Sequence, residues 1–268
     1  MAAPAWLTAR PIAHRGYHDV EAAAGGTGRC VENTLAAAEA AIARNFAIEC
    51  DLQPTADGGV VVFHDHTLDR LTDLSGPVAD KTLAAVRRAR FKNGDGLIPT
   101  LEELLDLVDG RVPLFIELKS RFDGDRRLEA AAVAILASYP GPVAVMSFDP
   151  ASMTAMRRLA PTLPRGMLAD HFTRADRLTI PFPARLAGRW LLAAPLVLPS
   201  FIAYEVNDLP ASAPLALRHF FHLPLLAWTV RTDANRETSR AWADQIIFEG
   251  FDPEAPPLRP PCAPTAAA

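Results

Sequence analysis

Short apolar runs alternate with longer amphipathic stretches along most of this chain, and several of the runs end in charged residues. The strand-like runs lie at residues 12–14, 46–52, 60–64, 114–119, 143–148, 165–169, 201–205, 225–230 and 245–248. Helix-like segments separate most of them, and four of these helices are expected to be capped by Asn33, Thr100, Asp149 and Asp233. This alternation of strands and helices predicts a parallel sheet.

The number of strands favours a closed barrel. Residues 60–64 follow a tight turn at Asp57-Gly58 and are expected to pair antiparallel with the strand before the turn, which leaves eight strands joined mostly by connections of crossover length. A TIM-like (β/α)8 barrel requires eight strands, so this α/β fold is predicted. An open doubly wound sheet is the alternative, but the glycine-rich residues 25–28 do not match a nucleotide-binding motif.

The chain is expected to form one domain. Residues 1–252 are assigned to a single barrel, with a small insertion at residues 66–98 after the second barrel strand. Residues 253–268 are rich in proline and alanine, which predicts an extended or disordered tail. The apolar tract 181–199 fits either a helix and loop packed on the core, which is favoured, or an apolar lip that meets lysophospholipid or a membrane.

Three polar clusters interrupt the apolar runs: His14-Arg15-Gly16, Glu49-Cys50-Asp51 and His64-Asp65. In a strand, residues two apart share a face, so the two carboxylates of the second cluster project together while Cys50 points away. If Asp57 and Gly58 are the central residues of the turn, His64 lies opposite Asp51, and a shift of one residue would still leave this imidazole beside the carboxylates.

A fourth strand adds Glu117 and Lys119, which are again two apart. Barrel active sites lie at the carboxyl ends of the strands, so both side chains are expected to join the same centre. Each of these patterns also has a purely structural interpretation. A lone Glu-x-Asp pair more often lies on the solvent-exposed face of an edge strand, and Glu117 with Lys119 could be a structural ion pair. Charges inside a barrel strand are costly, however, unless they are paired or bind metal.

Composition narrows the class of substrate and the compartment. The net charge of −4 and the absence of a long basic run argue against nucleic acid, so a small molecule is expected. The longest apolar run, 190–198, is far shorter than the roughly 20 residues of a transmembrane helix. Three cysteines without metal-ligand spacing indicate reduced thiols, and residues 1–10 lack a signal-peptide pattern, so a cytoplasmic protein is expected.

The order of these motifs resembles the glycerophosphodiester phosphodiesterases. The matching residues are His14-Arg15-Gly16, Glu32-Asn33-Thr34, Glu49-x-Asp51, Thr55-x-Asp57-Gly58, His64-Asp65, Glu117-x-Lys119 and Trp228-Thr229-Val230. The resemblance implies a TIM-like barrel, one divalent cation, and hydrolysis of glycerophosphodiesters to glycerol 3-phosphate and an alcohol. It also implies that the nucleophile is the glycerol 2-hydroxyl of the substrate itself, which forms a cyclic phosphate that water then opens.

The resemblance assigns roles position by position. Metal ligands are expected at Glu49, Asp51 and Glu117, an acid/base pair at His14 and His64, and stabilisers of the phosphate charge at Arg15 and Lys119. Oxygen-only ligands suit Mg²⁺ or Ca²⁺, and the sequence does not distinguish the two or assign which histidine acts first. Two roles are equally compatible with Trp228: its ring could form a flat apolar wall for the glycerol carbons, or it could be an ordinary core residue.

The chain departs from the family pattern at its last strand, where Phe248-Glu249-Gly250 replaces the more usual Thr-Asp, and in the segment 170–200. Both departures concern the range of substrates. The cluster Glu32-Asn33-Thr34 is interpreted as a device for helix capping and loop fixing. Two alternative functions remain: a phosphodiesterase of the lysophospholipase D type, and a barrel that binds phosphorylated ligands without turning them over.

Overall fold

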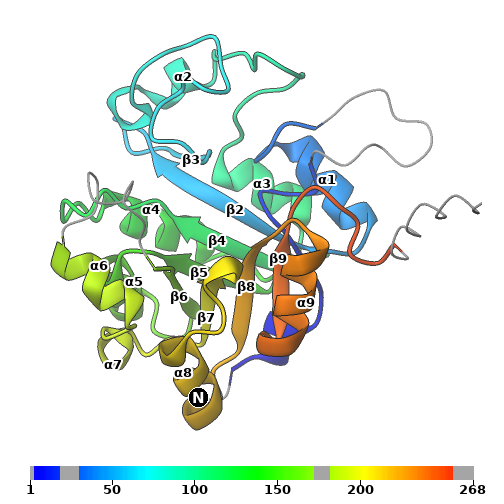
Figure 1. The fold of residues 1–268 in the computed structure, drawn as a ribbon. Coiled ribbons are helices and arrows are strands. Elements are labelled where there is room, and N and C mark those ends of the chain that lie inside the picture. Colours follow the sequence, from blue (N-terminus) through cyan, green and yellow to red (C-terminus); the bar gives the residue numbers. More distant parts are fainter. Residues whose placement is uncertain (1–2, 19–29, 172–181, 256–268) are drawn as a thin grey trace, which may run out of the picture.

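The computed structural model describes residues 3–18, 30–171 and 182–255 as a closed parallel barrel (Figure 1). Its strands are β1 (Ile12–Ala13), β2 (Ala47–Pro54), β4 (Leu114–Leu118), β5 (Val143–Ser147), β6 (Arg165–Ala169), β7 (Phe201–Glu205), β8 (Leu225–Val230) and β9 (Gln245–Phe248). Neighbours follow the order β1-β9-β8-β7-β6-β5-β4-β2, and β1 also pairs with β2, which closes the ring. The predicted (β/α)8 barrel is therefore confirmed.

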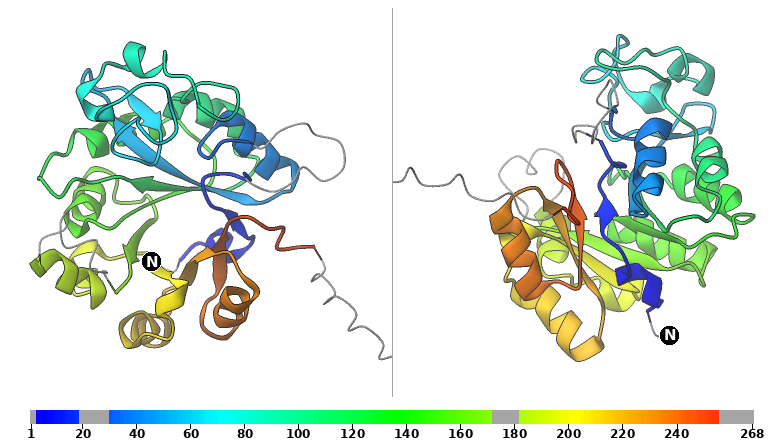
Figure 2. Two further views of the ribbon diagram at one scale, coloured as in Figure 1. Left: turned by 45° about the horizontal axis from the view of Figure 1, so that its top comes forward. Right: turned by 90° about the vertical axis from the view of Figure 1, so that its right-hand side faces the viewer.

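Helices surround the barrel, as the two views of Figure 2 show. They are α1 (Leu35–Ala43), α2 (Leu83–Val86), α3 (Leu101–Val108), α4 (Arg127–Leu136), α5 (Pro150–Leu159), α6 (Phe182–Arg189), α7 (Ala194–Val197), α8 (Ser212–Phe221) and α9 (Asp233–Trp242), with 3-10 turns at Ala5–Thr8, Val78–Asp80 and Val206–Asp208. Among the described residues, no helix is both long and apolar enough to cross a membrane.

Two of the four predicted helix caps are confirmed and two are wrong by one residue. Thr100 and Asp149 cap their helices through side-chain oxygens. Helix α1 is capped by Thr34 and not by Asn33, and α9 by Thr232 and not by Asp233. In each corrected case the threonine hydroxyl accepts the hydrogen bond from a first-turn amide, which is the defining contact of a cap.

The strands bury both faces. Side chains such as Phe115, Phe201 and Met146 fill the barrel interior, where the first two rings pack edge to face with centroids 5.7 Å apart. The alternate residues, including Ile48 and Cys50 of β2, belong to the cluster between the strands and the helices. Cys50 thus points away from the carboxylates, as predicted, and the interior below them is apolar.

The hairpin after β2 differs from the prediction by one residue. Strand β3 (Val60–Val62) pairs antiparallel with β2, and Leu52 lies opposite Val62. Asp51 therefore faces Phe63 and not His64, because three residues separate Thr55 from Gly59 where a two-residue turn was expected. Gly58 accommodates this longer turn with a φ of 88°, a conformation that glycine adopts without steric cost.

The segment 66–98 forms a cap over the carboxyl end of β2, at the top of Figure 1. It contains α2, and its side chains Leu68, Val78, Val86, Ala89, Phe91 and Ile98 form a separate buried cluster with Val61 and Phe63 of the preceding hairpin. The strand end that carries His64 is therefore held between the barrel and a small second core.

The apolar tract at 182–199 is only partly packed. Leu191, Ala194 and Val197 join the main core, as favoured by the sequence. Six large apolar side chains of the same tract are exposed, namely Phe182, Leu186, Trp190, Leu192, Leu196 and Leu198. The glycine-rich residues 25–28 and most of the predicted tail at 253–268 lie outside the described residues.

Candidate active site

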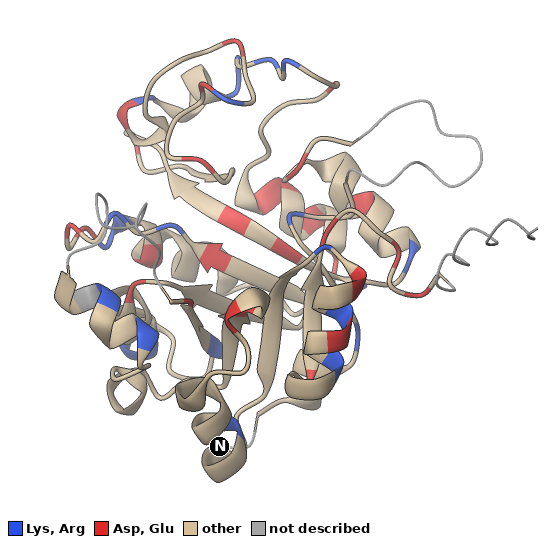
Figure 3. Cartoon of the chain, viewed as in Figure 1, with Lys and Arg blue, Asp and Glu red and all other residues tan. Residues whose placement is uncertain are grey.

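Three carboxylates from two neighbouring strands form the centre of the site. Glu49 and Asp51 project from β2 into the barrel mouth, and Glu117 projects from β4 directly beside Asp51 in the strand register. All three are buried, and one oxygen from each lies within 4.8 Å of the others. Figure 3 shows acidic residues in red on the neighbouring strands β2 and β4. Such a cluster can hold a metal ion, as the sequence predicted.

Two cations partly neutralise this cluster. Lys119 Nζ lies 2.9 Å from Asp51 Oδ1 and 2.8 Å from Glu117 Oε1, and Arg15 Nε lies 3.5 Å from Asp51 Oδ2. The backbone amide of Arg15 also donates to Glu49 Oε2 at 2.9 Å. Arg15 is also shared with Glu32, so the two cations do not balance the three carboxylates, and this set of oxygen donors fits a divalent cation.

The local fields separate the pKa values of the three acids. Burial raises the pKa of Glu49 well above its usual value, and the neighbouring carboxylates raise it further. Burial also raises the pKa of Glu117, although Lys119 opposes the shift. Burial acts in the same direction on Asp51, but Lys119, followed by His64 and Arg15, lowers the pKa of this acid overall. Glu49 is thus the acid of this cluster that most lacks a positive neighbour.

His14, at the end of β1, forms the first of two histidine arms. Its Nδ1 lies 2.5 Å from Glu249 Oε2, and the guanidinium of Arg231 donates to the same oxygen at 2.8 Å. Burial lowers the pKa of His14 to about 4, although the bond to Glu249 opposes this shift. The neutral ring therefore donates from Nδ1 to the carboxylate, and Nε2, which is 3.9 Å from Glu49 Oε2, is left as an acceptor. We call His14, Glu249 and Arg231 the His14 arm.

His64 has a similar arrangement of partners. Its Nδ1 lies 2.7 Å from Asp65 Oδ1, and Arg70 binds both oxygens of that carboxylate, at 2.5 and 3.0 Å. The side chain of His64 is 31% exposed, against 12% for His14. We call His64, Asp65 and Arg70 the His64 arm.

Glu32 and Asn33, which were interpreted from the sequence as capping and loop-fixing residues, also bind residues of the site. Glu32 Oε1 accepts from Arg15 at 2.8 Å and from Arg70 at 2.6 Å, so it connects the central cations with the His64 arm. The amide of Asn33 donates to Asp51 Oδ2 at 2.8 Å, and its own oxygen accepts from the backbone amide of Asp51. Asn33 reaches this position with a φ of 58°, which explains why the helix cap falls on Thr34 instead.

Sequence reasoning missed Glu249 as a site residue. The residue was noticed only as a departure from the family pattern, and the sole sequence signal for a role was its place at the carboxyl end of the last strand. Its partner His14 is 235 residues away along the chain, and only closure of the ring between β1 and β9 brings the two together.

A cavity of about 170 Å³ connects these groups. Seven of the eight predicted site residues line it, and the eighth, Asp51, is buried beside them. The remaining lining residues are Met146, Phe148, Leu168, Glu205, Thr229, Arg231 and Ile247. Trp228 forms part of the wall, with its ring edge to face against Phe148 at 5.4 Å between centroids. The structure therefore gathers every predicted residue at one barrel mouth.

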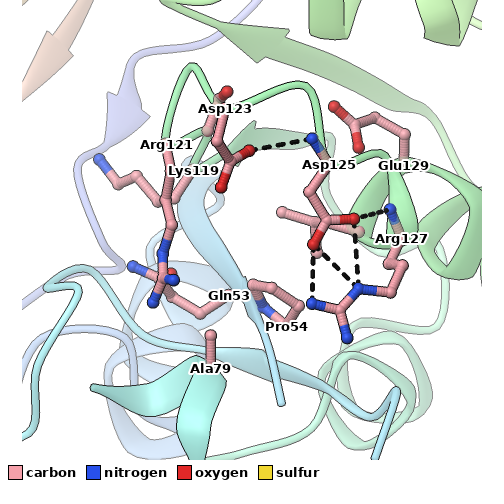
Figure 4. A pocket seen from close by; sticks show the side chains of 11 residues that line it. Gln53, Pro54, Ala79, Lys119, Arg121, Asp123, Asp125, Arg127 and Glu129 are labelled. Atoms are coloured by element: carbon pink, nitrogen blue, oxygen red, sulfur yellow. Dashed lines mark hydrogen bonds and ion pairs between the residues drawn. The ribbon is translucent and has the colours of Figure 1, made fainter. Parts of the chain in front are cut away.

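A second, smaller pocket lies beside Lys119 (Figure 4). Its volume is about 40 Å³, which suits one or a few water molecules. Its lining charges bind one another, since Asp125 accepts from Arg127 Nε at 2.9 Å and its amide donates to Asp123. The cavity lined by the predicted site residues is therefore the candidate substrate site.

The family model described as the glycerophosphoryl diester phosphodiesterase family matches residues 14–251. The chain belongs to this family. It is 30% identical over 234 residues to the glycerophosphodiester phosphodiesterase of Caldanaerobacter subterraneus. This alignment covers 83% of the present chain and 89% of the relative. It is 32% identical over 183 residues to that of Bacillus subtilis, and this alignment spans 59% of each protein.

Solved structures of the family share the fold. A phosphodiesterase from Oleispira antarctica, solved with the product sn-glycerol-3-phosphate, superposes with a TM-score of 0.71 over 89% of this chain and 92% of that one, at 20% identity. The glycerophosphodiester phosphodiesterase of Thermotoga maritima gives a TM-score of 0.66 at 22% identity, over 88% of this chain and 92% of its own. Both superpositions indicate a shared barrel fold.

Proposed function

We propose that this chain hydrolyses glycerophosphodiesters to glycerol 3-phosphate and an alcohol, in a metal-dependent reaction with two histidines. The observation that carries the proposal is that a buried acidic triad and two histidines held by carboxylates line or adjoin a single cavity. A barrel that only bound phosphate would need the cations but not two oriented imidazoles. Membership of the phosphodiesterase family supports the same reaction.

Glu49, Asp51 and Glu117 would hold the cation, for which Mg²⁺ and Ca²⁺ are the candidates because all three donors are carboxylate oxygens. When bound, the ion supplies positive charge that stabilises the phosphate as charge develops on it. Arg15 offers a planar pair of donors to the phosphate oxygens, and Lys119 offers a point charge. Both line the cavity and are already oriented by the carboxylates they bind.

The two histidines move the protons of the reaction. One imidazole Nε2 accepts the proton of the glycerol 2-hydroxyl as that oxygen bonds to phosphorus, and the other histidine donates a proton to the alcohol oxygen as its bond to phosphorus breaks. Water then opens the cyclic phosphate, with the two roles exchanged, to give glycerol 3-phosphate. Glu249 and Asp65 hold Nδ1 of their respective rings, which orients Nε2 for this task.

Release of glycerol 3-phosphate from glycerophosphocholine tests the proposal. We expect chelator-treated protein to be inactive and Mg²⁺ or Ca²⁺ to restore release. Glu49→Gln should abolish the restored activity, whereas Glu102→Gln, which changes an exposed carboxylate of α3, should leave it intact. Activity that survives chelation would overturn the metal requirement. Binding of the substrate without release would favour the non-catalytic barrel, and release only from lysophospholipids would favour a phosphodiesterase of the lysophospholipase D type.

We also propose that the protein works in the reducing environment of the cytoplasm. Cys30 and Cys50 are free thiols in the structure, and Cys50 is buried, so neither forms a disulfide with another described cysteine. Fractionation of cells that produce the protein would test this, and recovery outside the cytoplasm would contradict it.

A further inference from the structure

We propose that Glu205, Trp228 and Phe148 form a subsite for a positively charged ammonium group on the alcohol part of the substrate. This inference rests on the proposed function, because it names the class of phosphodiester that the site prefers. The substrates it predicts are zwitterions, with choline or ethanolamine esterified to the phosphate of glycerol phosphate.

All three residues line the catalytic cavity. Glu205 is the last residue of β7, and Trp228 is its direct neighbour on β8 in the strand register. Phe148 follows β5 and contacts Trp228 edge to face, at an interplanar angle of 86°. A carboxylate beside two aromatic rings is a common arrangement for binding an organic cation, because the ring faces and the carboxylate are both negative.

Among the described residues, one carboxylate oxygen of Glu205 has no bonding partner and could bind such a ligand. Its Oε1 accepts from the amide of Asn207 at 3.2 Å and from the side-chain Nδ2 of Asn207 at 2.7 Å. Within residues 3–18, 30–171 and 182–255, no hydrogen bond or ion pair engages Oε2. The nearby guanidinium of Arg231 is bound to Glu249 at 2.8 Å. Burial raises the pKa of Glu205, and the hydrogen bonds from Asn207 oppose this shift.

The cavity is polarised in the sense that a zwitterion requires. Arg15 and Lys119 line the side next to the acidic triad, where the phosphate would bind, and they carry the positive charge. Glu205 carries a negative charge on β7, several strands away in the barrel order. Ligand pockets for drug-sized molecules measure roughly 300–1,000 Å³, so a cavity of about 170 Å³ suits a small headgroup.

The test compares kcat/KM for glycerophosphocholine with kcat/KM for glycerophosphoglycerol, whose headgroup is neutral. We expect Glu205→Gln to lower the ratio of these two values by roughly tenfold, because the Coulombic attraction between the carboxylate and the quaternary ammonium is lost. Glutamine keeps an oxygen that can accept from the Asn207 amide, so the fold should be preserved, which circular dichroism would verify. Glu237→Gln, at an exposed position of α9, is the matched control and should leave the ratio unchanged.

A second measurement uses choline itself as a competitive inhibitor of glycerophosphoglycerol hydrolysis. The inhibition constant should rise about tenfold in Glu205→Gln and also rise in Trp228→Leu. An equal loss on both substrates would overturn the proposal and place Glu205 at the glycerol phosphate half. An unchanged ratio would also overturn it. If the wild-type protein hydrolyses no glycerophosphodiester at all, the proposed function fails instead, so the two failures are distinguishable.

Discussion

The His14 arm and the His64 arm present the same chemistry in two different settings. In each arm a carboxylate binds Nδ1 of the imidazole, and an arginine binds the carboxylate. The His14 side chain is 12% exposed and the His64 side chain is 31% exposed. His64 and Asp65 are adjacent in the sequence, whereas His14 and Glu249 are 235 residues apart and follow the first and last strands, which pair with each other.

The same arrangement of histidine, carboxylate and arginine is thus built from different parts of the fold. The His64 arm is local, because the end of β3 and the segment 66–98 supply all of its members. The His14 arm exists only where the first and last strands of the barrel meet. The burial of His14 also removes water as a substitute partner, so its carboxylate should matter more than that of His64.

The largest expected effect is loss of either imidazole. His14→Ala and His64→Ala should each lower kcat by roughly 10²–10⁴-fold, because each removes a positioned proton carrier. Steady-state turnover measures the loss, and circular dichroism should show that both variants remain folded. The exposed His219 on α8 provides the control, since His219→Ala should retain full activity. Active or unfolded variants would refute the assigned roles.

A smaller loss of activity is expected when the carboxylate that binds each histidine is replaced, and the two losses compare the arms directly. Glu249→Gln should lower kcat by about 100-fold and Asp65→Asn by about tenfold, since partners that orient a reactive imidazole contribute roughly 10–100-fold. The inequality follows from burial, because water can reach the more exposed His64 ring and replace the lost acceptor. Glu249→Asp, which keeps the charge, should restore part of the activity. If the Asp65 variant were the weaker enzyme, our explanation by burial would be wrong.

The smallest expected effect concerns stability in acid. Burial lowers the pKa of His14 to about 4, below the ordinary value of 6.5 in an unfolded chain. Between these values the unfolded state binds more protons, so stability falls as the pH falls through this window. His14 should therefore cost the folded metal-free protein about 2 kcal/mol between pH 7 and pH 5.

Urea unfolding of the metal-free wild type and of His14→Gln, at both pH values, measures this contribution. The wild type should lose about 2 kcal/mol more than the variant on acidification. The pKa of Glu249 is also lowered, which adds a loss of the same sign at lower pH, below about 4.5. An equal loss in both proteins would contradict the neutral, buried state of His14.

Much of the site could be predicted because its signals are local. The alternation in 49–51 and 117–119 places three carboxylates and a lysine on inward faces, and the strand register confirms this. The hairpin was predicted one residue out of register, because Asp-Gly is compatible with both two-residue and three-residue turns. The cap of α1 was missed for a related reason, since Asn33 is a good capping residue that is instead used to bind Asp51.

The sequence by itself determined the eight-stranded barrel, the acidic triad and the two histidines, because strand periodicity and residue type act over a few neighbouring positions. Only the tertiary structure decided that Glu249 holds His14, that Glu32 joins Arg15 to Arg70, and that Glu205 stands beside Trp228. These pairs come from separate segments of the chain, up to 235 residues apart. Their contacts arise when the sheet closes on itself, and no local pattern in the sequence records which strand ends will then meet.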